Sequence, residues 1–164
     1  MIVLKFTVPG LPTAKGRPQF VRRGKFVKVI TPTKTRNAER NFLAIAYQHR
    51  PPAPFTGPVK LRVRFYFPIP RSWPGWKKVA VSELEDKSHI HKTSKPDASN
   101  LLKLCEDAMI GVFYIDDSQL IEVNATKAYS NIPRTEVEIE TVKVIRKKKE
   151  LELWIKERSE DNDD

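Results

Sequence analysis

Apolar and polar residues alternate regularly over residues 59–67. The odd-numbered positions are Val, Leu, Val, Phe and Phe, whereas the even-numbered positions are three basic residues and Tyr66. This period of two predicts a strand with one buried face. Residues 134–142 predict a second such strand, because Val137 and Ile139 would face inward and the glutamates beside them outward.

Three other segments also have strand character. Residues 2–8 are mostly apolar and partly β-branched, and residues 119–128 are expected to form a further strand. Residues 20–30 predict a hairpin that turns around Arg23-Gly24 and exposes basic side chains.

Two helices are predicted between these strands. Leu101, Leu104, Cys105 and Ala108 recur at helical spacing, which predicts a helix from about 97 to 110 that ends at Gly111. A second helix is expected to begin with Thr33 or Thr35 as its cap and to run to about residue 49, where Pro51-Pro52 stops it. Residues 68–96 hold four prolines and form a long connection, with a short helix near 75–84.

This order of elements predicts an α+β domain. We expect a mixed or antiparallel sheet of about four to six strands, with two main helices packed on it. Residues 1–145 would form this single domain. Residues 146–164 would add a short helix, with Leu151, Trp154 and Ile155 on one face, and a disordered acidic tail.

The charge is concentrated at one end of the chain. Residues 1–50 hold eleven Lys and Arg against one acid, Glu39, which equals the net charge of +10 of all 164 residues. A basic N-terminal third is the footprint expected for a polyanionic partner, whereas the plainer interpretation is a soluble basic surface.

Cysteine content and hydropathy bound the class of protein. Cys105 is the single cysteine, which excludes a disulfide framework and a multi-cysteine zinc site. No apolar run approaches the length of a membrane span, and residues 1–6 lack the pattern of a signal peptide. We therefore expect a cytoplasmic protein with no membrane partner.

The acidic residues in the second half suggest chemistry. Asp97 begins a predicted helix, Lys103 lies inside that helix, and Asp116-Asp117 precede the next strand. Magnesium takes one or two carboxylates and completes its shell with water and substrate phosphate, so these aspartates could share an ion if the chain folds back after the helix. The plainer alternatives are a helix cap for Asp97, a turn pair for Asp116-Asp117 and a solvated charge for Lys103.

Other residues with reactive or stacking side chains have plainer roles. His89 and His91 are expected to be exposed loop residues more often than ligands. Cys105 lies on the apolar helix face, so we expect a buried structural thiol. Trp73 and Trp76 are suited to stacking on bases or to packing under the long connection.

The chain resembles the RusA-type Holliday junction resolvases, endodeoxyribonucleases of bacteria and their phages, over residues 95–123 (KPDASNLLKLCEDAMIGVFYIDDSQLIEV). The family pattern is Asp-x-Asp-Asn-x-x-Lys, then a helix, then Asp-Asp-x-Gln at the start of a strand. A weaker match is the segment 9–18 (PGLPTAKGRP), followed by Thr31-Pro32 and a helix. These landmarks extend to about residue 142.

The resemblance implies a Mg²⁺-dependent homodimer, with Mn²⁺ as a substitute metal, that resolves four-way DNA junctions in recombination and repair by paired nicking. It gives catalytic roles to Asp97, Lys103, Asp116 and Asp117. The three aspartates would hold the metal, and Lys103 would stabilise negative charge or assist proton transfer. A homodimer suits a junction because both have two-fold symmetry.

The residues expected to contact DNA are basic or amide side chains of the N-terminal loop, the hairpin and the motif. They are Lys15, Arg17, Arg22, Arg23, Lys25, Lys28, Lys95 and Asn100.

Ser99 departs from the family pattern, because it stands where the family has its second aspartate. The site therefore works with the remaining aspartates, or Glu106 or Asp107 substitutes, or the protein binds DNA and cuts it poorly. A non-catalytic protein that binds branched DNA is thus the second hypothesis. An RNA-binding accessory protein, supported by basic charge alone, is the third.

Overall fold

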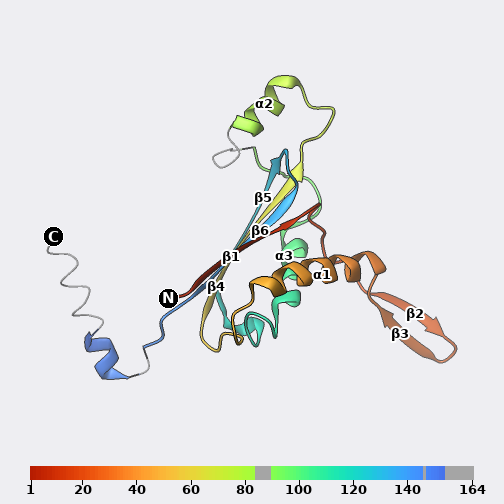
Figure 1. Ribbon diagram of the computed structural model, residues 1–164. Coiled ribbons are helices and arrows are strands. Elements are labelled where there is room, and N and C mark those ends of the chain that lie inside the picture. The colour runs from red at the N-terminus through yellow and green to blue at the C-terminus, as the bar shows by residue number, and fades with distance from the viewer. Residues whose placement is uncertain (84–89, 146, 154–164) are drawn as a thin grey trace.

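The computed structural model describes residues 1–83, 90–145 and 147–153, and its main body is one mixed four-stranded sheet with two helices on one face (Figure 1). The strands are β1 (Val3–Pro9), β4 (Val59–Pro68), β5 (Leu120–Ser130) and β6 (Arg134–Thr141), in the order β1-β6-β4-β5. The β1–β6 and β6–β4 pairs are antiparallel, and β4–β5 is parallel. The predicted α+β class and all four strands are confirmed.

A separate hairpin and a small helix project from this body (Figure 1). The hairpin consists of β2 (Gln19–Arg23) and β3 (Phe26–Ile30), which pair with each other and project beyond α1 (Figure 1). The long connection contains α2 (Gly75–Glu83), which agrees closely with the short helix predicted near residues 75–84. This helix lies beyond the end of the sheet (Figure 1).

The core lies between the sheet and the helices α1 (Thr33–Ala46) and α3 (Ala98–Met109). Phe6, Val137, Val63 and Ala125 are register partners across the four strands and share the helix-facing side. Phe6 also stacks on Phe113, with ring centroids 5.4 Å apart. Each fully buried valine or phenylalanine side chain contributes roughly 1.5–3 kcal/mol to the stability of the fold through its removal from water.

The outer face of the sheet is charge-balanced. The Lys5 ammonium lies 3.1 Å from Glu138, whose other carboxylate oxygen is 3.0 Å from the Arg62 guanidinium. Lys60 pairs with Glu122 at 3.1 Å. Because acids oppose these cations, the excess positive charge of the N-terminal third lies elsewhere.

The start of α1 corrects one prediction. Neither Thr33 nor Thr35 is the cap, because Pro32 occupies that position with φ −54° and makes no side-chain capping hydrogen bond. Thr35 is buried and accepts a hydrogen bond from the Gly16 backbone N–H at 3.0 Å, so a tertiary contact uses its hydroxyl instead. The helix ends at Ala46, and a 3₁₀ turn, η1 (Tyr47–His49), completes the predicted range.

The two tryptophans of the connection differ in their surroundings. Trp73 packs edge-on against Tyr129, with centroids 4.6 Å apart, as the packing alternative expects. Trp76 is exposed on α2. His91 is also exposed and bridges Ala128 at the edge of the sheet, whereas His89 lies outside the described residues.

The C-terminal segment is described in part. Residues 148–153 are helical, but Trp154, Ile155 and the acidic end of the chain lie outside the described residues, so the predicted helix face and tail stay predictions. Among the described helices, none has the length and apolarity that a membrane crossing needs.

Candidate active site along helix α3

Helix α3 separates its apolar side chains from its polar ones. Leu101, Leu104 and Cys105 are buried on the sheet, as their helical spacing predicts. The fourth predicted position, Ala108, is only partly buried, and Met109 is buried beside it instead. Burial raises the pKa of the Cys105 thiol well above its usual range, so this thiol stays protonated and has a structural role. The other side of the helix carries the polar residues of the motif.

Asp97 lies at the N-terminal end of that polar side. It occupies the N-cap position, but its side chain makes no capping hydrogen bond. The Asn100 amide donates to Asp97 Oδ2 at 3.5 Å. The carboxylate is exposed, so it is available to a ligand in a way that a simple helix cap is not.

Lys127 of β5 anchors the backbone of the segment that precedes Asp97. The Lys127 ammonium donates to the carbonyl oxygens of Ser94, at 3.0 Å, and Pro96, at 2.8 Å. Lys127 is the register partner of Phe65, so it projects from the helix-facing side of β5. Sequence reasoning missed this role, although a lysine at an inward position of a predicted strand was the available signal.

Lys103 and Asp107 form an ion-pair network in the middle of the polar side. The Lys103 ammonium lies 3.2 Å from Asp107 Oδ1 and 3.4 Å from Asp117 Oδ2, and Asp107 Oδ2 also accepts from Lys15. The hydrogen bond to Asp107 raises the pKa of Lys103, so Lys103 is protonated at neutral pH. This charge state suits stabilisation of negative charge better than proton abstraction.

Asp116 and Asp117 have different surroundings. Asp116 caps η2 (Asp117–Gln119), because its carboxylate accepts a hydrogen bond from the Ser118 backbone N–H at 2.9 Å. Hydrogen bonding from Ser118 lowers the pKa of Asp116. The turn alternative therefore describes Asp116, whereas Asp117 reaches Lys103.

Gln119 fastens this turn to the body. Its Oε1 accepts from the backbone N–H groups of Ile115, at 2.7 Å, and Asp116, at 3.0 Å. Its Nε2 donates to the carbonyl oxygens of Phe55, at 2.8 Å, and Gly57, at 2.9 Å. The glutamine of the Asp-Asp-x-Gln pattern therefore positions the loop that carries Asp117.

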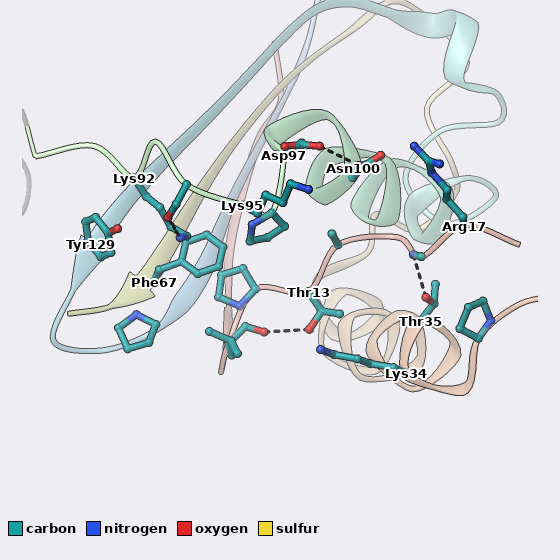
Figure 2. A pocket seen from close by; sticks show the side chains of 18 of the residues that line it. Thr13, Arg17, Lys34, Thr35, Phe67, Lys92, Lys95, Asp97, Asn100 and Tyr129 are labelled. Atoms are coloured by element: carbon teal, nitrogen blue, oxygen red, sulfur yellow. Dashed lines mark hydrogen bonds between the residues drawn. The ribbon is translucent and has the colours of Figure 1, made fainter. Parts of the chain in front are cut away.

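A groove of about 1010 Å³ opens beside the Asp97 end of α3. Figure 2 shows Asp97 and Asn100 on α3 across the groove from Lys34 and Thr35 on α1. Both helices begin at this groove, so the positive ends of two helix dipoles lie there. The basic side chains that line it are Arg17, Lys34, Lys92 and Lys95.

The N-terminal loop connects the two helices at the groove. The Lys15 backbone N–H donates to the Asn100 carbonyl at 2.8 Å, while the next residue, Gly16, bonds Thr35. A Cβ at Gly16 would lie 2.8 Å from Thr35 Oγ1 and 3.3 Å from Pro32 Cγ, so this close approach needs glycine.

Apart from Asp116, which caps η2, the predicted site residues lie in three places. Arg17, Lys95, Asp97 and Asn100 line the groove. Lys15, Lys103 and Asp117 belong to the ion-pair network. The hairpin holds the remaining predicted DNA contacts, Arg22, Arg23, Lys25 and Lys28.

Two features of the site differ from expectation. Sequence reasoning missed Lys34 and Lys92, whose only signal was the basic character of their segments. Within the described residues, no three acidic, histidine or cysteine side chains gather closely enough to hold a metal, so Asp97, Asp116 and Asp117 do not form a three-carboxylate cluster.

Comparison with known proteins gives one family and two relatives. The family model "Endodeoxyribonuclease RusA" matches residues 9–140. An uncharacterized protein of Bacillus subtilis (strain 168), YqaN, is 40% identical over 143 residues, which cover 87% of this chain and 99% of that protein. The crossover junction endodeoxyribonuclease rusA of Lactococcus phage r1t is 34% identical over 86 residues, which cover 52% of this chain and 56% of that protein.

Gln119→Ala should loosen the turn that carries Asp117. Removal of the side chain leaves two backbone N–H groups and two carbonyls without their partner. We expect a loss of about 2 kcal/mol or more in the free energy of unfolding, measured by urea denaturation. Gln48→Ala is the matched control, because Gln48 makes one exposed hydrogen bond, to Ala44. A loss no larger than that of the control would contradict the role given to Gln119.

Asp107→Asn should destabilise the protein in a pH-dependent way. Burial of the Asp107 carboxyl opposes ionisation, but the hydrogen bonds from Lys15 and Lys103 outweigh it and lower the pKa. A lowered folded-state pKa stabilises the protein above the unfolded value of about 3.9, and this contribution is lost as pH falls through the folded value.

Denaturation at neutral pH and in steps down to about pH 3 measures this effect. The variant should be less stable by about 1 kcal/mol at pH 7, and the difference should shrink in acid. A difference that stays constant or grows in acid would show that the charge of Asp107 is not responsible.

Proposed function

This chain belongs to the RusA family of endodeoxyribonucleases, and from that premise we propose that it resolves four-way DNA junctions by metal-dependent nicking of paired strands. The family match and the likeness to the phage protein support a crossover junction endodeoxyribonuclease. The resemblance over residues 95–123 is thereby confirmed at the level of the family.

One observation carries the proposal. Asp97, at the N-cap of α3, receives a hydrogen bond from Asn100 at 3.5 Å, and Asp117, on η2, lies 3.4 Å from Lys103 of the same polar helix side. Asn100 and Lys103 are three residues apart, so they are neighbours on the helix surface. This line of residues begins at a groove lined by four cations.

The donor set suits a hard divalent cation. Asp97 and Asp117 would hold Mg²⁺, or Mn²⁺ in its place, and two carboxylates with water and substrate phosphate satisfy an octahedral ion. Such an ion supplies Lewis-acid activation of water and of the phosphate. Both carboxylates are exposed and make few hydrogen bonds in the structure, as ligands open to an ion should.

The remaining residues have distinct tasks in this proposal. Lys103 stabilises the negative charge that develops on the phosphate, since its raised pKa keeps it protonated. Arg17, Lys34 and Lys95 bind the DNA phosphates that flank the position of the cut. Lys127 is a positioning residue, because it holds the two carbonyls that precede Asp97.

The assembly is also part of the proposal. A junction presents two strands related by two-fold symmetry, so a homodimer would place one site at each strand. The domain of residues 1–145 would act as the nuclease, in recombination and repair, and the C-terminal residues would be an appendage to it.

Ser99 supports a second candidate function, a protein that binds branched DNA without cutting it. Ser99 is exposed in the first turn of α3, two residues after Asp97, where the family pattern has an aspartate. The lack of a three-acid cluster in the described part of the chain also favours this candidate. Its metal site would then be too weak in charge to bind the ion tightly.

Asp97→Asn and Asp117→Asn should each abolish Mg²⁺-dependent nicking of a synthetic four-way junction. Junction affinity should stay nearly unchanged, because the groove cations remain. Glu122→Gln is the control, since Glu122 lies on the charge-balanced outer face. Normal nicking by both aspartate variants would disprove the site, whereas a wild-type protein that binds and never nicks would establish the second candidate.

Ser99→Asp should strengthen the metal site by restoring a carboxylate at the position of the family pattern, two residues after Asp97. The expected result is a lower Mg²⁺ concentration at half-maximal nicking, or nicking where the wild type has none. Ser99→Asn is the matched control, because it adds a similar volume without charge. An equal effect of both substitutions, or none, would show that charge at position 99 does not limit the site.

A further inference from the structure

The β2–β3 hairpin exposes apolar side chains that the fold itself does not use. Phe20 is 74% exposed, Phe26 80%, Val27 62% and Val29 57%. A two-stranded hairpin is marginally stable alone, and large side chains on such a ribbon are normally packed against something. These side chains are therefore suited to an external partner.

The strand register places one phenylalanine on each side of the ribbon. Phe20 pairs with Val29 and Arg22 with Val27, so these four share one side. Phe26 and Lys28 lie on the opposite side, because side chains alternate along a strand. Each side thus combines an aromatic ring with a cation, which suits insertion between two nucleic-acid surfaces.

Charge identifies the partner. Residues 1–38 contain no acidic residue, and Arg22, Lys25 and Lys28 are exposed on the hairpin. Two such hairpins would repel each other across a symmetric contact between two copies of this chain. Phosphates would be attracted, and exposed bases stack on aromatic rings.

Position connects the hairpin with the groove. The hairpin starts two residues after Arg17 and ends two residues before Pro32, and both of these residues line the groove. Five-residue strands extend roughly 17 Å, which is about five base steps along one strand of DNA. The hairpin therefore begins and ends at the edge of the groove, within reach of a strand bound there.

We propose that the β2–β3 hairpin is a wedge that enters the branch point of the junction and stacks Phe20 and Phe26 on its unpaired or terminal bases. This inference rests on the proposed function, and it adds the device by which the protein distinguishes branched from linear DNA. The hairpin cations guide the ribbon between the arms, and the rings stabilise the opened bases.

The test uses the full-length protein in EDTA, so that no strand is cut. A four-way junction carries 2-aminopurine at its branch point, and a linear duplex of equal length is the comparison. Wild type should raise the 2-aminopurine fluorescence as the base leaves its stack. The double variant Phe20→Ser/Phe26→Ser should lose this rise and about tenfold or more in junction affinity, with duplex affinity within about twofold.

Tyr47→Ser is the matched control, because Tyr47 is 49% exposed at the other end of α1 from the groove. It should behave as wild type. Circular dichroism verifies the fold. Substitution of exposed side chains on the hairpin should leave the fold intact. Light scattering should give the same mass for the double variant as for wild type.

Three results would overturn the wedge. These are wild-type binding without a fluorescence change, equal loss of junction and duplex binding, and dissociation of an oligomer in the double variant, which would make the hairpin a contact between copies of the chain. Each can occur while Asp97→Asn still abolishes nicking, so the wedge can fail without the proposed function.

Discussion

The burial of one side of helix α3 determines where every polar residue of the site lies. Leu101, Leu104, Cys105 and Met109 fix the rotation of the helix on the sheet. Since residues three or four apart share a side of a helix, this rotation turns Asn100, Lys103 and Asp107 away from the core together. A substitution that rotated or shifted α3 would therefore move the whole line of polar groups, and the core is dense enough to resist it.

Electrostatics then divides the surface into regions with different tasks. The outer face of the sheet pairs its cations with glutamates, which leaves little net attraction for a polyanion there. The groove and the hairpin carry cations with few acidic neighbours. Asp107 is the exception within the site, because it holds Lys15 and Lys103. Asp107 therefore holds Lys103 next to Asp117. It also neutralises Lys15, which is then less available to bind a phosphate.

Local patterns allowed the elements to be predicted from the sequence, whereas contacts between distant segments were not predictable. Strand β4 and helix α3 follow from alternation and helical spacing, which are properties of neighbouring residues. The parallel β4–β5 pairing, the contact of Lys15 with Asp107 and that of Gly16 with Thr35 depend on the tertiary fold. The family pattern supplied Asp97, Lys103 and Asp117, but not the different surroundings of Asp116. The role of Lys127 was not predicted, because a lysine at a core-facing position interrupts the apolar pattern of a strand and does not by itself indicate a contact.

Asp97 at the N-cap of α3 and Asp117 on η2 are proposed to serve one metal centre, although they contact different residues of the helix, Asn100 and Lys103. Electron paramagnetic resonance of Mn²⁺, titrated into the protein with a junction whose scissile phosphate resists cleavage, tests this directly. We expect one tightly bound Mn²⁺ per chain, lost equally in Asp97→Asn and in Asp117→Asn. Retention of that Mn²⁺ in either variant, with wild-type affinity, would contradict it.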